Sequence, residues 1–209
     1  MVARRTEPGS ERLTRRAERK LIARVRAGDA EAVRQLVDVH KDRLFAFVWR
    51  IIRDHHDAEE ICQDAFMRAF SSLETFRPEY RFSTWLFTIG YRLCLNWIRR
   101  RHEVTGEVDL GVVRSGEPDP ASGLAESEEA RRLKDKIWEA VDQLSVPQRA
   151  AVLLYYREGQ NCQDISKTLQ MPVATVKSHL HRARAGLRLL LSDVADDWSR
   201  VSVLKEGVS

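Results

Sequence analysis

The chain has 209 residues and a formal net charge of +4, which allows one large domain or two small ones. No apolar run reaches the roughly 18 residues that a membrane span needs, so we expect no membrane insertion. The three cysteines, Cys62, Cys94 and Cys162, are widely spaced and form no zinc-binding pattern. They favour a reducing, cytoplasmic setting, and the sequence predicts neither a metal nor another cofactor.

Charge is distributed in blocks along the chain. Residues 1–20 carry seven basic and three acidic side chains, residues 102–130 one basic and eight acidic, and residues 131–192 eleven basic and five acidic. Basic blocks on either side of an acidic one indicate two nucleic-acid-facing domains joined by a charged spacer. We expect a basic N-terminal arm (1–20), a helical domain (21–101), an acidic linker rich in Gly and Pro (102–129), a second helical domain (130–192) and a C-terminal tail (193–209).

The first domain reads as a series of helices. Gly28 is placed to end a short helix, and Asp29 to cap a second one that keeps helical apolar spacing as far as Ile52. His40 lies on the apolar side of that second helix and is expected to be a core histidine with satisfied hydrogen bonds. A third helix, from Asp57 to Leu73, has an apolar side wider than one core contact requires. It is a candidate docking surface for a partner, formed by Glu60, Gln63, Asp64, Phe66, Met67 and Phe70.

The stretch from Phe76 to Arg101 holds seven of the chain's aromatic residues, interleaved with arginines. Cations bind phosphates and flat rings stack on unpaired bases, so this pattern predicts a grip on single-stranded nucleic acid. Pro78 favours a loop before the next helix, which Ser83 can cap. We expect exposed rings on this loop and an outward-facing basic side on the helix. The candidate residues are Phe76, Arg77, Tyr80, Phe82, Arg92, Asn96, Arg99 and Arg100.

An alternative for this stretch is that most of its rings belong to the core of a helical domain. Trp85 and Trp97 are expected to be buried, whereas Phe76, Tyr80 and Phe82 are expected to be free.

The C-terminal domain contains the most specific pattern of the sequence, a helix-turn-helix over residues 162–181. Asn161 is placed to cap a short helix, Gln170 and Met171 form a tight turn, and Pro172 stands where a longer helix begins. The second helix of such a pair enters the major groove of DNA. Small and basic side chains on its open face suit contact with base edges and phosphates. These candidates are Thr175, Lys177, Ser178, His179, His181, Arg182 and Arg184.

With these motifs the chain resembles an extracytoplasmic-function (ECF) sigma factor, the small two-domain specificity subunit of bacterial RNA polymerase. Asp57 to Leu73 is similar to the region 2 helix that docks on the polymerase, and Phe76 to Arg101 to the part that melts and reads the −10 element. Cys162 to Arg184 is similar to the region 4 reader of the −35 element. Gln170 departs from the family, which often has glycine at this turn.

The resemblance implies an all-α fold of two helical domains joined by a flexible acidic linker, and no enzymatic activity. It also implies three partners: core RNA polymerase, promoter DNA in double- and single-stranded form, and an anti-sigma factor.

Two other classes of function remain open from the residues. A stand-alone helix-turn-helix regulator would need a dimer interface, and it would leave the aromatic-basic loop and the acidic linker unexplained. An enzyme such as a nuclease ranks last, because the sequence holds no phosphate loop, no HExxH and no nucleophile elbow.

Overall fold

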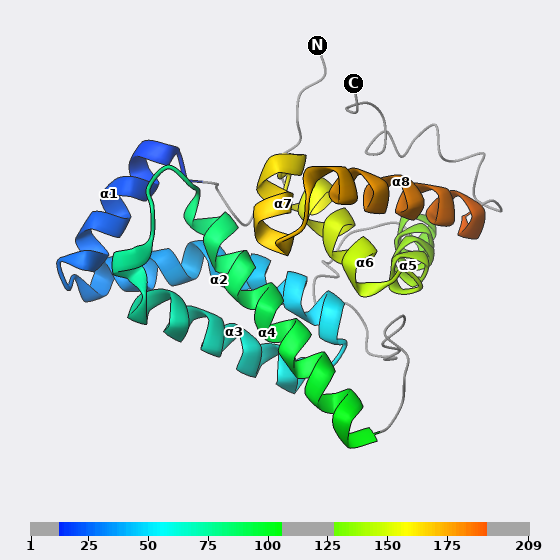
Figure 1. Ribbon diagram of the computed structural model, residues 1–209, viewed down its shortest axis with the longest axis horizontal. Helices are drawn as coiled ribbons and strands as arrows, with labels where there is room; N and C mark the ends of the chain where they lie inside the picture. Colours follow the sequence, from blue (N-terminus) through cyan, green and yellow to red (C-terminus); the bar gives the residue numbers. More distant parts are fainter. Residues whose placement is uncertain (1–12, 106–127, 192–209) are drawn as a thin grey trace, which may run out of the picture.

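The computed structural model describes residues 13–105 and 128–191, and in those ranges the regular structure is helical throughout, so the all-α prediction is confirmed. The N-terminal unit comprises α1 (Arg15–Arg26), α2 (Ala30–Ile52), α3 (His55–Ser71), the short 3-10 helix η1 (Leu73–Thr75) and α4 (Phe82–Thr105). The C-terminal unit comprises α5 (Glu128–Asp142), α6 (Val146–Val152), the π-helical turn η2 (Leu153–Arg157), α7 (Cys162–Leu169) and α8 (Val173–Leu190). Figure 1 shows the two units side by side.

Local chemistry sets several of the helix boundaries. Gly28 ends the turn after α1 with a φ of +83°, and the Asp29 carboxylate accepts hydrogen bonds from the first amide groups of α2. Asn161 caps α7 in the same way, through the amide of Asp164. Gln170 ends α7 in the left-handed conformation, with φ 55° and ψ 46°, a backbone state that costs a non-glycine residue about 1 kcal/mol. These boundaries agree with the sequence prediction.

The predicted boundary between arm and domain at residues 20 and 21 falls inside a helix. α1 begins at Arg15 and buries Glu18, Leu21, Ile22 and Val25. Only residues 13 and 14 of the predicted arm precede α1 in the described part of the chain. The linker prediction falls mostly on residues 106–127, which lie outside the described residues, as do 1–12 and the tail from 192.

Helices α2, α3 and α4 pack around an apolar core that α1 extends at one end. Leu36, Leu44 and Phe47 of α2 are fully buried. The axes of α2 and α4 approach closely at Gly90, where an added Cβ would lie 3.0 Å from Leu44 Cδ1. A larger residue at Gly90 would push Leu44 out of place. This close packing holds α4 rigidly against α2 along the middle of the N-terminal unit.

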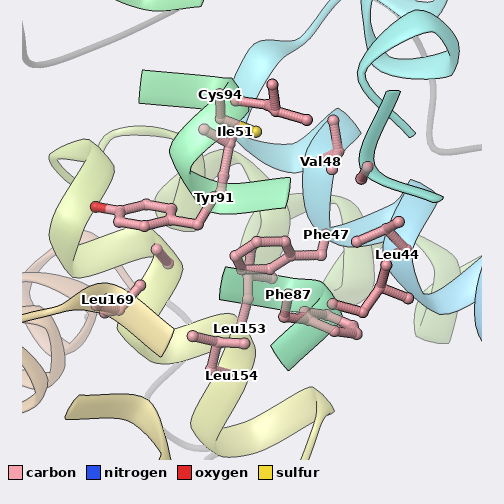
Figure 2. Close-up of a cluster of buried hydrophobic side chains, with 14 of the residues drawn as sticks. Leu44, Phe47, Val48, Ile51, Phe87, Tyr91, Cys94, Leu153, Leu154 and Leu169 are labelled. Carbon is pink, nitrogen blue, oxygen red and sulfur yellow. The ribbon is translucent and has the colours of Figure 1, made fainter. Parts of the chain in front are cut away.

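The two units share one core, whereas the sequence predicted only two helical domains joined by a linker. Helix α7 lies against α4, and α6 lies against the C-terminal half of α2 (Figure 1). Leu153, Leu154 and Leu169 of the C-terminal unit join a cluster that includes Phe87 and Tyr91 (Figure 2). Each fully buried leucine side chain contributes roughly 1.5–3 kcal/mol of stability, so this interface favours the arrangement in which the two units are packed together, which we call the closed arrangement.

Candidate nucleic-acid interface

The ends of the loop between η1 and α4 are anchored by aromatic rings. Phe76 is 4% exposed and Phe82 is fully buried, so the expectation that these two rings are free is wrong. Their centroids lie 5.8 Å apart, and both contact Trp85, which is half-buried. Phe82 also packs against His40 of α2. The free energy gained by burying these rings outweighs the preference of the charged neighbours for solvent, because η1 turns Phe76 inward onto the start of α4.

The tip of the same loop is exposed. Arg77, Glu79 and Arg81 face solvent, and Tyr80 is 42% exposed, as the sequence predicted for this ring. The Lys167 ammonium of α7 lies 4.4 Å from the centroid of the Tyr80 ring, a cation–π distance. The loop therefore presents one accessible ring between cations.

The polar side of α4 faces the C-terminal unit over its first half rather than solvent. Thr84 is buried and Thr88 is half-buried there. Arg92 donates from Nε to Oε1 of Gln170 over 2.9 Å. A groove of ≈ 360 Å³ remains between the units, lined by Tyr80, Thr84, Trp85, Thr88, Lys167 and Gln170. The prediction of an outward-facing polar side thus holds only beyond Arg92, where Arg99 and Arg100 are exposed and Asn96 accepts a hydrogen bond from Arg99. Trp97 is half-buried rather than buried.

The candidate docking surface on α3 is mostly accessible. Glu60, Gln63 and Asp64 are exposed, and Met67 is 71% exposed. Phe66 is buried, with its ring stacked on the half-buried Phe70 at 6.1 Å, so it supports this surface from below instead of forming it. A polarisable, unbranched methionine surrounded by acidic and amide groups suits docking against a protein partner.

The second helix of the helix-turn-helix, α8, has a free basic face. Lys177, Ser178, His181 and Arg182 are exposed, whereas Val176 and Leu180 on the other side are buried. Thr175 and His179 are half-buried. Arg184 is also half-buried, and its Nε donates to the Tyr156 hydroxyl over 2.7 Å, so it stabilises the π-helical turn. The open face is thus narrower than the predicted set and centres on the four exposed residues.

Charged residues that sequence reasoning missed join the two units. Arg43 of α2 donates to Glu158, which follows η2, with Nε 2.9 Å from Oε2; the side chains are 16% and 2% exposed. Arg53 lies 2.8 Å from Asp142, and the buried Arg149 donates to the backbone oxygen of Arg50 over 3.0 Å. The sequence does not show which residues pair when they lie about a hundred positions apart. It does show that Arg149 is a charged residue within an apolar helical stripe, which indicates a buried charge that needs a partner.

His40 is a core residue as expected, but its hydrogen bonds are not satisfied. It is 3% exposed, and neither ring nitrogen has a hydrogen-bond partner among the described residues. Burial, with a smaller contribution from Arg43, lowers the pKa of His40 to about 4, so the ring is neutral near pH 7. No group of three or more metal-binding side chains occurs in the described ranges. Nor does any helix there have the length and apolar character to cross a membrane.

Comparison with known proteins agrees with this arrangement. The family models for Sigma-70 region 2 and Sigma-70 region 4 match residues 36–104 and 134–187. The ECF RNA polymerase sigma factor SigW of Bacillus subtilis is 31% identical over 186 residues, covering 84% of this chain and 97% of its own. The RNA polymerase sigma-H factor of Pseudomonas aeruginosa is also 31% identical, over 84% of this chain and 94% of its own.

Two solved structures have a similar fold. The sigma factor RpoE of Bartonella quintana, in complex with the anti-sigma factor NepR, has a TM-score of 0.63 and 26% identity, over 76% of this chain and 96% of its own. CnrH, in complex with the cytosolic domain of CnrY, has a TM-score of 0.61 and 23% identity, over 84% of this chain and 97% of its own. The chain has a region 2 unit with an exposed α3 face and a region 4 unit with a helix-turn-helix, and it is similar to these relatives over most of its length. The chain therefore belongs to the ECF sigma factors of RNA polymerase.

Proposed function

We propose that the chain binds core RNA polymerase through the exposed side of α3 and uses two separate surfaces to select and open a promoter. The observation that carries this proposal is the separation of two basic surfaces on different units. One is the open face of α8, and the other is the loop tip at Arg77 to Arg81 with the end of α4. A single duplex reader needs only the first surface, whereas a protein that also opens DNA needs both.

The open face of α8 reads the upstream element as duplex. Lys177 and Arg182 supply the positive charge that neutralises phosphates, and Ser178 and His181 are short or planar groups that fit against base edges. Region 4 has this role in the family, and these four side chains are accessible without any rearrangement of the C-terminal unit. Thr175, His179 and Arg184 support the helix from its half-buried flanks.

The loop tip and the end of α4 hold the opened strand at the downstream element. Tyr80 offers the ring for a flipped base, and Arg77, Arg99 and Arg100 neutralise its phosphates. Stacking contributes about 1–3 kcal/mol per base, which is comparable to the few kcal/mol needed to extrude one base. Phe76 and Phe82 act indirectly, because their buried rings fix the ends of the loop that carries Tyr80.

The two units separate when the chain engages polymerase and promoter. Helix α7 covers the first half of the polar side of α4, and Lys167 occupies the face of the Tyr80 ring. A DNA strand that follows α4 from Arg92 toward Tyr80 needs the space that α7 fills. The closed arrangement is thus a resting state, and binding of both promoter elements favours an open one.

The partners follow from the same surfaces. The sigma factor RpoE of Bartonella quintana, which has a similar fold, is bound to the anti-sigma factor NepR. We propose that an anti-sigma protein likewise holds this chain inactive. We also propose that this chain acts in the cytoplasm, where the polymerase is. The protein catalyses no reaction of its own in this scheme.

A reconstituted transcription assay tests the proposal. Core polymerase alone and with the chain is offered a promoter library, and transcripts that appear only with the chain identify its promoters. The Met67→Asp variant should lose these transcripts together with co-purification of polymerase, whereas Met67→Leu should retain both. If the chain instead bound palindromic duplexes as a dimer and ignored polymerase, it would be a stand-alone regulator and the proposal would be wrong.

A further inference from the structure

Helix α1 forms four hydrogen bonds to the segment 73–82, which contains the loop between η1 and α4. Arg26 donates from Nη2 to the backbone oxygens of Leu73 and Phe76, each over 2.9 Å. Arg19 donates from Nη2 to the backbone oxygen of Pro78 over 3.2 Å. The acceptors bracket the first half of the segment from η1 to α4, so two side chains of one helix hold its backbone in a single path.

The far end of the segment is fixed by the same helix. The amide of Phe82, the first residue of α4, donates to Oε1 of Glu18 over 2.9 Å. The sequence predicted Ser83 as the cap of this helix, but Ser83 lies inside α4. A carboxylate at the amino end of a helix satisfies amides that have no partner within the helix and interacts favourably with its dipole.

Glu18 retains this role despite its burial, which leaves it 6% exposed. The pKa of Glu18 is raised above its usual value, because burial outweighs the lowering by hydrogen bonds from the backbone of Phe82 and Ser83 and by the charges of Arg81 and Arg15. Burial of an acid costs free energy unless hydrogen bonds compensate it, and for Glu18 the donors are amides at the start of α4. The Sigma-70 region 2 match starts at residue 36, after the end of α1, so it assigns no role to this helix.

We infer that α1 is a positioning element for strand capture: Glu18, Arg19 and Arg26 order the loop so that Arg77 and Tyr80 are presented before DNA arrives. This inference rests on the proposed function of the loop. Each backbone residue fixed in advance is one that the DNA need not order, and ordering a flexible loop reduces affinity. Glu18 is buried, so it acts on the strand only through the loop whose backbone it binds.

The test uses the full chain with core polymerase and a promoter selected by the wild-type protein. Arg26→Ala removes two hydrogen bonds to the loop, and Arg16→Ala on the same helix is the matched control, because Arg16 is exposed and no hydrogen bond joins it to the loop. Arg26→Ala should accelerate amide hydrogen exchange over residues 73–82 and reduce open complexes about tenfold, given typical values for hydrogen bonds to charged groups. Arg26→Ala should leave the upstream duplex footprint unchanged. The control Arg16→Ala should have the same melting temperature as the wild-type protein.

Two further variants separate positioning from general stability. Arg26→Lys retains the positive charge and can still donate a hydrogen bond to one of the two backbone oxygens, so it should recover part of the opening activity. Arg19→Ala, at an exposed position, should give a smaller loss without unfolding the chain. Faster exchange with normal opening would overturn the inference and leave the proposed function intact, as would unchanged exchange in Arg26→Ala. A wild-type chain that binds polymerase but opens no promoter would instead refute the proposed function, and the inference would fall with it.

Discussion

Loss of the ion pair between Arg43 and Glu158 should open the closed arrangement of the two units. In the closed state the Glu158 side chain is 2% exposed and Arg43 16% exposed, whereas separation of the units returns both groups to water. Removing one partner of a buried pair costs about 3–5 kcal/mol, because the other charge stays buried without it. Since Arg43 retains some contact with solvent, we take the lower limit, about 3 kcal/mol. Each 1.4 kcal/mol is a factor of ten, so Arg43→Ala should shift the closed-to-open equilibrium by about a hundredfold.

Fluorescence energy transfer between the units measures this shift. Ser71→Cys on α3 and Arg188→Cys on α8 place dyes on exposed positions, in a Cys162→Ser background in which Cys62 and Cys94 remain buried. Arg43→Ala should lower the transfer efficiency and increase affinity for a single-stranded −10 oligonucleotide. Lys41→Ala is the control, because Lys41 pairs with Asp38 on the exposed side of the same helix. The exchanged pair, Arg43→Glu with Glu158→Arg, should restore part of the transfer. Equal transfer in wild type and Arg43→Ala would refute the reasoning.

Three other predictions address single side chains. Tyr80→Ala should weaken open complexes by about 1–3 kcal/mol without changing upstream footprints, while Tyr80→Phe should behave like wild type; permanganate reactivity of unpaired thymines measures this. Phe76→Ala should destabilise the fold by about 3–5 kcal/mol in urea unfolding, because its ring is buried, and a stable variant that fails only in opening would contradict that assignment. His40, with its pKa lowered to about 4, takes up its proton more readily when unfolded, so stability should be full above pH 6.5 and fall toward pH 4; the difference from His40→Leu should change by about 3 kcal/mol over this window.

The sequence predicted local structure well because local chemistry determines it. Asp29 and Asn161 act as helix caps where the pattern placed them, and Gln170 takes the left-handed position that the helix-turn-helix requires. The amphipathic spacing of α3 and α8 likewise identified the centres of their exposed faces, although Phe66 is buried and Phe70, Thr175, His179 and Arg184 are half-buried. These features depend on residues within a turn or two of each other.

Features that depend on distant residues were missed. A ring on a charged loop is expected to be accessible, yet Phe76 and Phe82 are buried against Trp85. Helix α1 also holds the backbone there, because Arg26 donates a hydrogen bond to the backbone oxygen of Phe76. The cap of α4 comes from Glu18, 64 positions away, and the first half of the polar side of α4 is covered by α7. Composition and periodicity contain no information on which surfaces of two helical units meet, so the closed arrangement required the structure.

The Glu18 cap has a practical consequence for chimaeras assembled from parts of different sigma factors. A fusion joint placed at residue 36, where the Sigma-70 region 2 match starts, would import α4 without the acid that completes its first turn and without the arginines that grip the preceding backbone. Such a hybrid would have every residue of the loop between η1 and α4 and still hold it loosely. Joints placed before Arg15 would transplant the loop together with the helix that shapes it.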